Sequence, residues 1–259
     1  MMLDNPCVAH RGFSGIAPEN TLAAIRLAMK IPEVQGIEID VQLSRDGVPV
    51  VIHDFTLGRT TNGSGTVREH TLSELKLLDA GRWKARAFTG ERIPTLDEVL
   101  EEVRGRLRVN IELKTNKQTY AGLASAAVEA VRRCEMEEQV YFTSFEPGAL
   151  IEARQTAPHI PRGLIVDTRS ADLDRRLDEY GCTLLSIKHG RVDPVFVRST
   201  LESGIKMMVW TVDRIRRMRE LASMHPELML CTNRPDRWLL ARRLPLLNRP
   251  NTRRRWLGL

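Results

Sequence analysis

Short apolar runs alternate with amphipathic helical stretches along almost the whole chain. This alternation is typical of repeated βα units around a parallel sheet, and it predicts an α/β fold. The strand-like runs cover residues 6–10, 36–43, 48–53, 107–113, 139–143, 162–166, 183–187, 206–210 and 228–231. Helix-end signals support the alternation, as capping boxes, as glycines where helices end and as prolines in first turns (Thr71 with Glu74, Thr95 with Glu98, Gly81, Gly105, Gly181, Gly204, Pro147, Pro194 and Pro235).

One junction departs from this pattern, because only four residues separate the runs 36–43 and 48–53. Parallel strands need a crossover of about a dozen residues or more, so these two runs must form an antiparallel hairpin. Asp46-Gly47 is a natural two-residue turn. With that turn, Asp40 lies approximately opposite His53.

The returning strand can be set aside as a hairpin arm, which leaves eight parallel strands, the number that closes a (β/α)8 TIM barrel. The glycine-containing stretch 54–106 then predicts a small inserted cap region near the barrel mouth. We expect a single catalytic domain over residues 1–245 and a basic C-terminal tail over residues 246–259.

Composition is that of an ordinary soluble globular protein, with 42% hydrophobic and 28% charged residues. No run approaches the roughly 20 apolar residues that span a bilayer, and the first residues lack the pattern of a signal peptide. These observations predict a cytoplasmic location. The four cysteines form no CxxC motif, so we expect them to be reduced and mostly buried.

The formal net charge of +6 is compatible with an anionic partner. Much of it lies at the end of the chain, in Arg242-Arg243 and Arg253-Arg254-Arg255. A solvated tail is the simplest interpretation of that run. A weak contact with a membrane surface or within an oligomer is the alternative, and the oligomeric state stays open.

Polar residues end several of the predicted strands, at the edge where barrels of this type place catalytic groups. In Glu38-Ile39-Asp40 the two-residue period puts both carboxylates on one face, and Glu112 repeats this pattern on the next barrel strand. His10 ends the first strand, and His53 ends the hairpin arm.

Three carboxylates that converge inside a barrel repel one another unless a cation or a proton offsets their charge. Oxygen ligands without cysteine favour Mg²⁺ or Ca²⁺ and leave room for a substrate phosphate. The alternative is a structural network in which the acids only pair with Arg11 and Lys114.

His10 and His53 would flank this metal as an acid and base pair, which histidine can supply near neutral pH. Arg11 and Lys114 supply positive charge for a phosphate, or serve as counter-ions of the carboxylates. Glu19 precedes a helix start capped by Asn20 or Thr21, and a role in orienting His10 or Arg11 is a further hypothesis.

Taken together, these motifs resemble the glycerophosphodiester phosphodiesterase family over residues 8 to about 236. The resemblance depends on the order of His10-Arg11-Gly12, Pro18-Glu19-Asn20-Thr21, Glu38-Ile39-Asp40-Val41, His53-Asp54, Arg59-Thr60-Thr61-Asn62-Gly63, Ile93-Pro94-Thr95-Leu96, Glu112-Leu113-Lys114 and Trp210-Thr211-Val212.

The resemblance implies metal-dependent hydrolysis of glycerophosphodiesters to sn-glycerol 3-phosphate and an alcohol, with Ca²⁺ or Mg²⁺ and through a cyclic phosphate. It implies metal ligation, acid-base catalysis and phosphate binding by the residues already named for these tasks. It also implies that Phe145 and Trp210 form walls of the substrate pocket. Without the resemblance, both aromatics would be interpreted as core residues.

One departure concerns the last strand, where the family often shows Thr-Asp-x-Pro and this chain has Thr232-Asn233-Arg234-Pro235. An acidic role at position 233 is therefore in doubt, whereas Asp213 fits the Asn or Asp that the family has after Trp-Thr-Val.

Two rival functions stay open. One is a related barrel that acts on lysophospholipids or other lipid phosphodiesters, docked through the tail arginines and Trp256. A long apolar groove beside the cap region would favour it. The other is a non-catalytic phosphate- or nucleic-acid-binding protein, which leaves the acidic residues unexplained. We expect a small-molecule substrate and no nucleic-acid partner.

Overall fold

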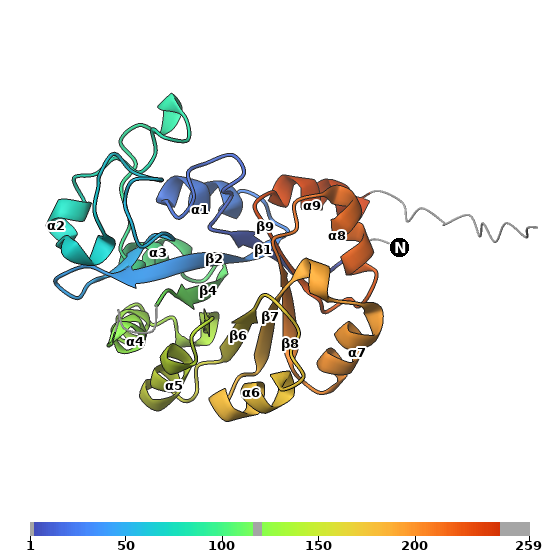
Figure 1. The fold of residues 1–259 in the computed structure, drawn as a ribbon. Helices are drawn as coiled ribbons and strands as arrows, with labels where there is room; N and C mark the ends of the chain where they lie inside the picture. The colour runs from blue at the N-terminus through green and yellow to red at the C-terminus, as the bar shows by residue number, and fades with distance from the viewer. Residues whose placement is uncertain (1–2, 116–120, 244–259) are drawn as a thin grey trace, which may run out of the picture.

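Eight parallel strands close into a barrel in the computed structural model, which describes residues 3–115 and 121–243. Around the barrel, β1 pairs with both β2 and β9, while β3 adds to β2 as an antiparallel arm (Figure 1). The expected TIM barrel is confirmed. The strands are β1 Cys7–His10, β2 Val34–Leu43, β3 Pro49–Val51, β4 Arg108–Leu113, β5 Val140–Ser144, β6 Arg162–Val166, β7 Leu184–Lys188, β8 Lys206–Trp210 and β9 Met229–Thr232.

Helices surround the barrel, as Figure 1 shows. Both predicted capping boxes are present, and three of the four predicted glycines follow helices with left-handed backbone. Gly81 does not end a helix; it packs against the carbonyl oxygen of Phe88, where a Cβ atom would not fit. The helices are α1 Leu22–Met29, α2 Leu72–Leu75, α3 Leu96–Val103, α4 Leu123–Arg133, α5 Pro147–Thr156, α6 Leu173–Tyr180, α7 Pro194–Glu202, α8 Ile215–Ala222 and α9 Pro235–Arg243.

The long strand β2 organises the mouth of the barrel. One of its edges pairs with β1 along the first half of the strand and with β3 along the second half. Its other edge pairs with β4. The arm therefore continues the line of β1 beyond the point where β1 ends, and it brings the residues after β3 above the barrel interior.

The register of the hairpin differs by one residue from the predicted register. Leu43 pairs with Pro49, and Asp40 accepts a backbone hydrogen bond from Ile52, not from His53. The Ser44 N–H donates to the Val48 carbonyl, so the loop between these two residues has three residues, not two, and Gly47 takes the left-handed conformation with φ of 79°. His53 still reaches the site because the chain leaves the sheet after Val51.

A second hydrophobic cluster lies beside the barrel, under the chain that follows the arm. Its buried members are Val50, Ile52, Leu57, Val67, Leu75, Ala80 and Ile93. In Figure 1 this part of the chain, coloured cyan to green and including α2, projects to one side of the strands. We call residues 54–95 the cap region. Helix α3 packs into the main core, between sheet and helices, and not into this second cluster.

The four cysteines are free and buried, as predicted. No helix among residues 3–115 and 121–243 is both long and apolar enough to cross a membrane. The predicted basic tail, including Trp256, lies outside the described residues.

Candidate active site

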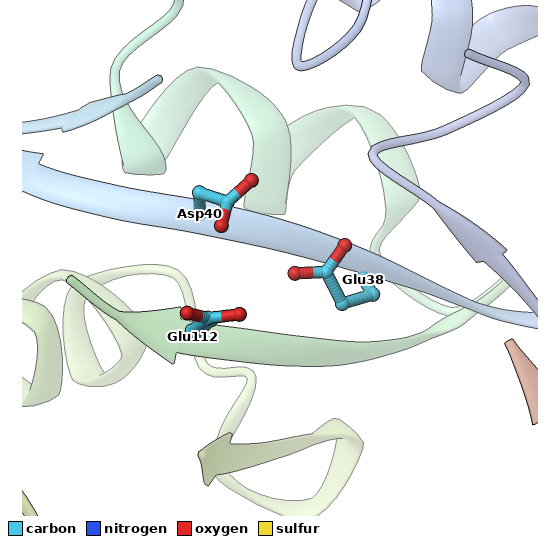
Figure 2. Close-up of side chains that lie close together, drawn as sticks. All are labelled: Glu38, Asp40 and Glu112. Atoms are coloured by element: carbon cyan, nitrogen blue, oxygen red, sulfur yellow. The ribbon is translucent and has the colours of Figure 1, made fainter. Parts of the chain in front are cut away.

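Three acidic side chains meet inside the barrel mouth. Glu38 and Asp40 extend from the same face of β2, and Glu112 extends from β4, where its residue pairs with Asp40 across the sheet. One carboxylate oxygen from each lies within 4.8 Å of the others. Figure 2 shows the three carboxyl groups between the two strands. The predicted cluster therefore forms, because alternation and register place all three on the inner face.

Two oxygens of this cluster are buried without a hydrogen-bond donor among the described residues, namely Glu38 Oε1 and Asp40 Oδ1. A buried carboxylate oxygen without a donor is costly, since its hydration is lost and not replaced. A hard divalent cation would satisfy both atoms and would take its ligands from carboxylates. The residues present thus fit a divalent metal site.

The electrostatics of the cluster favour a bound cation. Burial and the neighbouring Asp40 charge raise the pKa of Glu38 to about 8, and the same two causes raise the pKa of Glu112 to about 7. Burial also opposes ionisation of Asp40, but Arg11 and Lys114 outweigh it and hold its pKa below the usual range. Asp40 is therefore the most readily ionised of the three, and a bound cation would favour ionisation of Glu38 and Glu112.

Arg11 and Lys114 both form ion pairs with the carboxylates. Arg11 Nε lies 3.0 Å from Asp40 Oδ2, and Lys114 Nζ lies 2.8 Å from Glu112 Oε1 and 3.7 Å from Asp40 Oδ1. The backbone N–H of Arg11 also donates to Glu38 Oε2 at 3.0 Å. Both cations are counter-ions of the acids in this structure, and both line the cavity, where a phosphate could also contact them.

His10 lies at the edge of the cluster, with Nε2 3.7 Å from Glu38 Oε2. Its Nδ1 is 2.7 Å from the side-chain oxygen of Asn233, which follows β9. Burial, followed by the nearby Arg11, lowers the pKa of His10. Protonation of the imidazole is therefore disfavoured; one of its nitrogens contacts Asn233 and the other faces the acids.

His53 has a different partner on its Nδ1, the carboxylate of Asp54 at 2.6 Å. Arg59 donates to Asp54 at 2.6 Å and to Glu19 at 2.7 Å, and Glu19 also accepts from Arg11 at 2.8 Å. Of the two partners considered for Glu19, the structure shows a contact with Arg11; its orienting role stays a prediction. Through these ion pairs, Glu19 ties the loop after β1 to the cap region.

Two further side chains that sequence reasoning missed hold these groups in place. Asn20 donates to Asp40 Oδ2 at 2.9 Å, whereas Thr21 is the residue that caps α1. The buried amide of Gln42 donates to the carbonyls of Ile52, His53 and Asp54 at 2.8–3.0 Å. Gln42 continues the two-residue period of Glu38 and Asp40, so this pattern could have identified it.

The cavity above the cluster has a volume of about 160 Å³. The predicted site residues His10, Arg11, Glu38, His53, Glu112 and Lys114 line it, together with Phe145 and Trp210. The two aromatic rings meet edge to face at a centroid distance of 5.9 Å, and Phe145 is 39% exposed. Phe145 is therefore not a core residue, and both rings form walls of the cavity. A site of this kind can bind an anion beside a metal and exchange protons with two histidines.

Comparisons with known proteins agree with this geometry. A family model described as the glycerophosphoryl diester phosphodiesterase family matches residues 10–237. A glycerophosphodiester phosphodiesterase of Caldanaerobacter subterraneus subsp. tengcongensis is 39% identical over 218 residues, which cover 83% of this chain and 88% of that protein.

Solved structures of similar proteins share the fold. An Oleispira antarctica phosphodiesterase in complex with the product sn-glycerol-3-phosphate has a TM-score of 0.86 and 34% identity, covering 91% of this chain and 96% of that one. A glycerophosphodiester phosphodiesterase of Agrobacterium tumefaciens str. C58 has a TM-score of 0.79 and 33% identity, covering 91% and 99%. With the family match extending from His10 to the last barrel helix, the chain belongs to the glycerophosphoryl diester phosphodiesterase family.

Proposed function

We propose that the chain hydrolyses glycerophosphodiesters to sn-glycerol 3-phosphate and an alcohol, with a divalent cation bound by Glu38, Asp40 and Glu112. The observation that carries the proposal is the buried acidic cluster, which has two oxygens without a donor among the described residues and borders a cavity that His10 and His53 also line. Mg²⁺ and Ca²⁺ are the ions that suit an all-carboxylate set. The related enzyme that holds sn-glycerol-3-phosphate supports the substrate class.

The charges around the cavity favour a phosphodiester. Three carboxylates against the cations Arg11 and Lys114 leave one net negative charge when all are ionised. A divalent cation held by the three carboxylates would change this to one net positive charge and would supply Lewis-acid polarisation of the phosphate oxygens. A phosphodiester, which carries a single negative charge, then neutralises the site.

The histidines supply the proton transfers. In the first step, the glycerol 2-hydroxyl attacks phosphorus, one histidine accepts the hydroxyl proton, and the bond from phosphorus to the leaving alcohol breaks. The other histidine, in its protonated form, donates its proton to the leaving alkoxide oxygen, which gives the free alcohol. In the second step, water adds to the cyclic phosphate, the ring oxygen leaves as the 2-hydroxyl, and the same two side chains reverse their roles. Arg11 and Lys114 hold the phosphate, while Phe145 and Trp210 enclose the substrate.

The lining of the cavity bears on the rival lipid substrates. Most of the lining residues have charged or polar side chains, and no described residue of the cap region belongs to the lining, which favours a polar diester over a long acyl chain. Water-soluble diesters are therefore the proposed substrates.

The division into a catalytic domain over residues 1–245 and a basic tail stays a prediction.

Replacement of each histidine by alanine tests the acid-base proposal. We expect His10→Ala and His53→Ala to abolish turnover of glycerophosphocholine with Mg²⁺ and with Ca²⁺, and to leave cation binding measurable by calorimetry. His159→Ala, at an exposed histidine outside the cavity, is the matched control and should keep full activity. Near wild-type activity in both site variants would rule out the assignment.

A further inference from the structure

The side chain of Asn233 holds His10 from the side that faces away from the acidic cluster. Asn233 lies between β9 and α9, and its Oδ1 is 2.7 Å from His10 Nδ1. The other ring nitrogen, Nε2, faces Glu38. In a neutral imidazole, Nε2 is therefore unprotonated if Nδ1 donates to Asn233, and protonated if Nδ1 accepts from it.

The orientation of the Asn233 amide is set by Asp213, which follows β8. Asn233 donates to this carboxylate twice, from Nδ2 at 2.8 Å and from its backbone N–H at 2.9 Å, and Thr232 Oγ donates at 3.0 Å. An ionised carboxylate only accepts hydrogen bonds, so the nitrogen of the amide must face Asp213. The oxygen of the amide then faces His10, where Ser14 Oγ contacts it at 2.8 Å.

This orientation of the amide determines which ring nitrogen of His10 carries the hydrogen. An amide oxygen cannot donate, so a contact of 2.7 Å requires a hydrogen on His10 Nδ1. In the neutral imidazole only one nitrogen carries a hydrogen, and the lone pair is then on Nε2. The nitrogen that faces the cavity is thus the one able to accept a proton.

We propose that Asp213 and Asn233 act as a positioning pair that keeps the His10 proton on Nδ1 and aims the Nε2 lone pair at the acidic cluster. The effect of this pair on turnover rests on the proposed function, whereas the position of the proton on the imidazole does not. Neither residue of the pair lines the cavity, so both act through His10.

The pair needs one carboxylate and one amide, and the chemistry does not dictate which position holds which. Asn233→Asp would place two carboxylates within 2.8 Å of each other, whereas Asp213→Asn would remove the anion that orients the amide. Exchanging the two residues keeps one donor group and one acceptor group in contact and still offers an oxygen to His10. The departure at position 233 from the Thr-Asp-x-Pro pattern is then balanced by the aspartate at 213.

A swap experiment tests the pair. We expect Asp213→Asn and Asn233→Asp each to lower kcat for glycerophosphocholine by roughly 10- to 100-fold with little change in KM, as is usual for groups that orient a functional histidine. The double variant with both changes should recover most of the lost kcat. Asp236→Asn, the same exchange at a residue that pairs with Arg234, is the matched control and should leave kcat unchanged.

Nitrogen-15 NMR of His10 gives a readout that does not depend on turnover. In chelated wild-type protein at alkaline pH, Nδ1 should carry the proton and Nε2 should show the shift of an unprotonated nitrogen, and the double variant should match it. A protonated Nε2 in the wild type, single variants with full activity, or a double variant no better than the singles would each overturn the proposal. A wild type without turnover would refute the proposed function and leave the NMR test intact.

Discussion

Replacement of Glu38 by glutamine should stabilise the metal-free protein while it weakens metal binding. The pKa of Glu38 is raised from an ordinary value of 4.5 to about 8, chiefly by burial and then by Asp40. As pH rises from 4.5 towards 8, the unfolded chain loses this proton and the folded chain keeps it. Each pH unit in that range therefore costs folding about 1.4 kcal/mol, and at pH 7 the sum is on the order of 3 kcal/mol.

Glutamine has no proton to lose, and its oxygen can still accept from the backbone N–H of Arg11. We expect metal-free Glu38→Gln to unfold several degrees above the wild type at neutral pH, since about 1 kcal/mol shifts the midpoint of a chain of this size by about 2–4 °C. The difference should grow from about pH 5 to about pH 8 and then level off. Added Mg²⁺ or Ca²⁺ should stabilise the wild type more than the variant.

Thermal unfolding with and without a chelator, over this pH range, measures these effects. Glu138→Gln, at an exposed glutamate far from the cluster in sequence, is the matched control and should unfold like the wild type. A metal-free Glu38→Gln protein less stable than the wild type at neutral pH would refute the reasoning. So would a difference that shrinks as pH rises.

Further predictions concern the groups around the cluster. Asp54→Asn should lower kcat by roughly 10- to 100-fold, because the Asp54 carboxylate lies 2.6 Å from His53 Nδ1 and orients the ring. Calorimetry should find unchanged metal affinity. The control Asp174→Asn, at an exposed helical position, should change neither kcat nor metal affinity. Asn20→Ala should lower the free energy of unfolding in urea by about 1–3 kcal/mol, because the buried Asp40 loses a donor; an unchanged midpoint and slope would contradict this. Gly12→Ala should destabilise more than Gly47→Ala: both positions have positive φ, but only at Gly12 would a Cβ atom meet backbone, at 2.7 Å from Ala24. Equal losses in urea would count against that steric argument.

The barrel and the acidic cluster were predictable because they depend on short-range patterns. Alternation puts Glu38 and Asp40 on one face of β2, and the pairing of Asp40 with Glu112 puts the third carboxylate on the same face of the sheet. The number of predicted parallel strands is eight, and eight is the number that closes a (β/α)8 barrel. The position of His53 was predicted for a partly wrong reason, since the three-residue connection moves the hairpin pairing by one residue.

Glu19 was expected to orient His10 or Arg11, but most contacts of the supporting residues could not be predicted, because their partners lie far along the chain. His10 and Asn233 are 223 residues apart, and Glu19 and Arg59 are 40 residues apart. No spacing rule links such pairs; only barrel closure, with β9 beside β1, brings the first together. Gln42 is the exception, because it lies on the face already assigned to the site.

Product formation by chelated and metal-loaded protein tests the central claim most directly. The substrate is glycerophosphocholine, and the product is identified by phosphorus NMR. We predict no turnover in the chelator, and release of sn-glycerol 3-phosphate when Mg²⁺ or Ca²⁺ is restored. Equal turnover with and without the chelator, or none with either cation, would contradict the account.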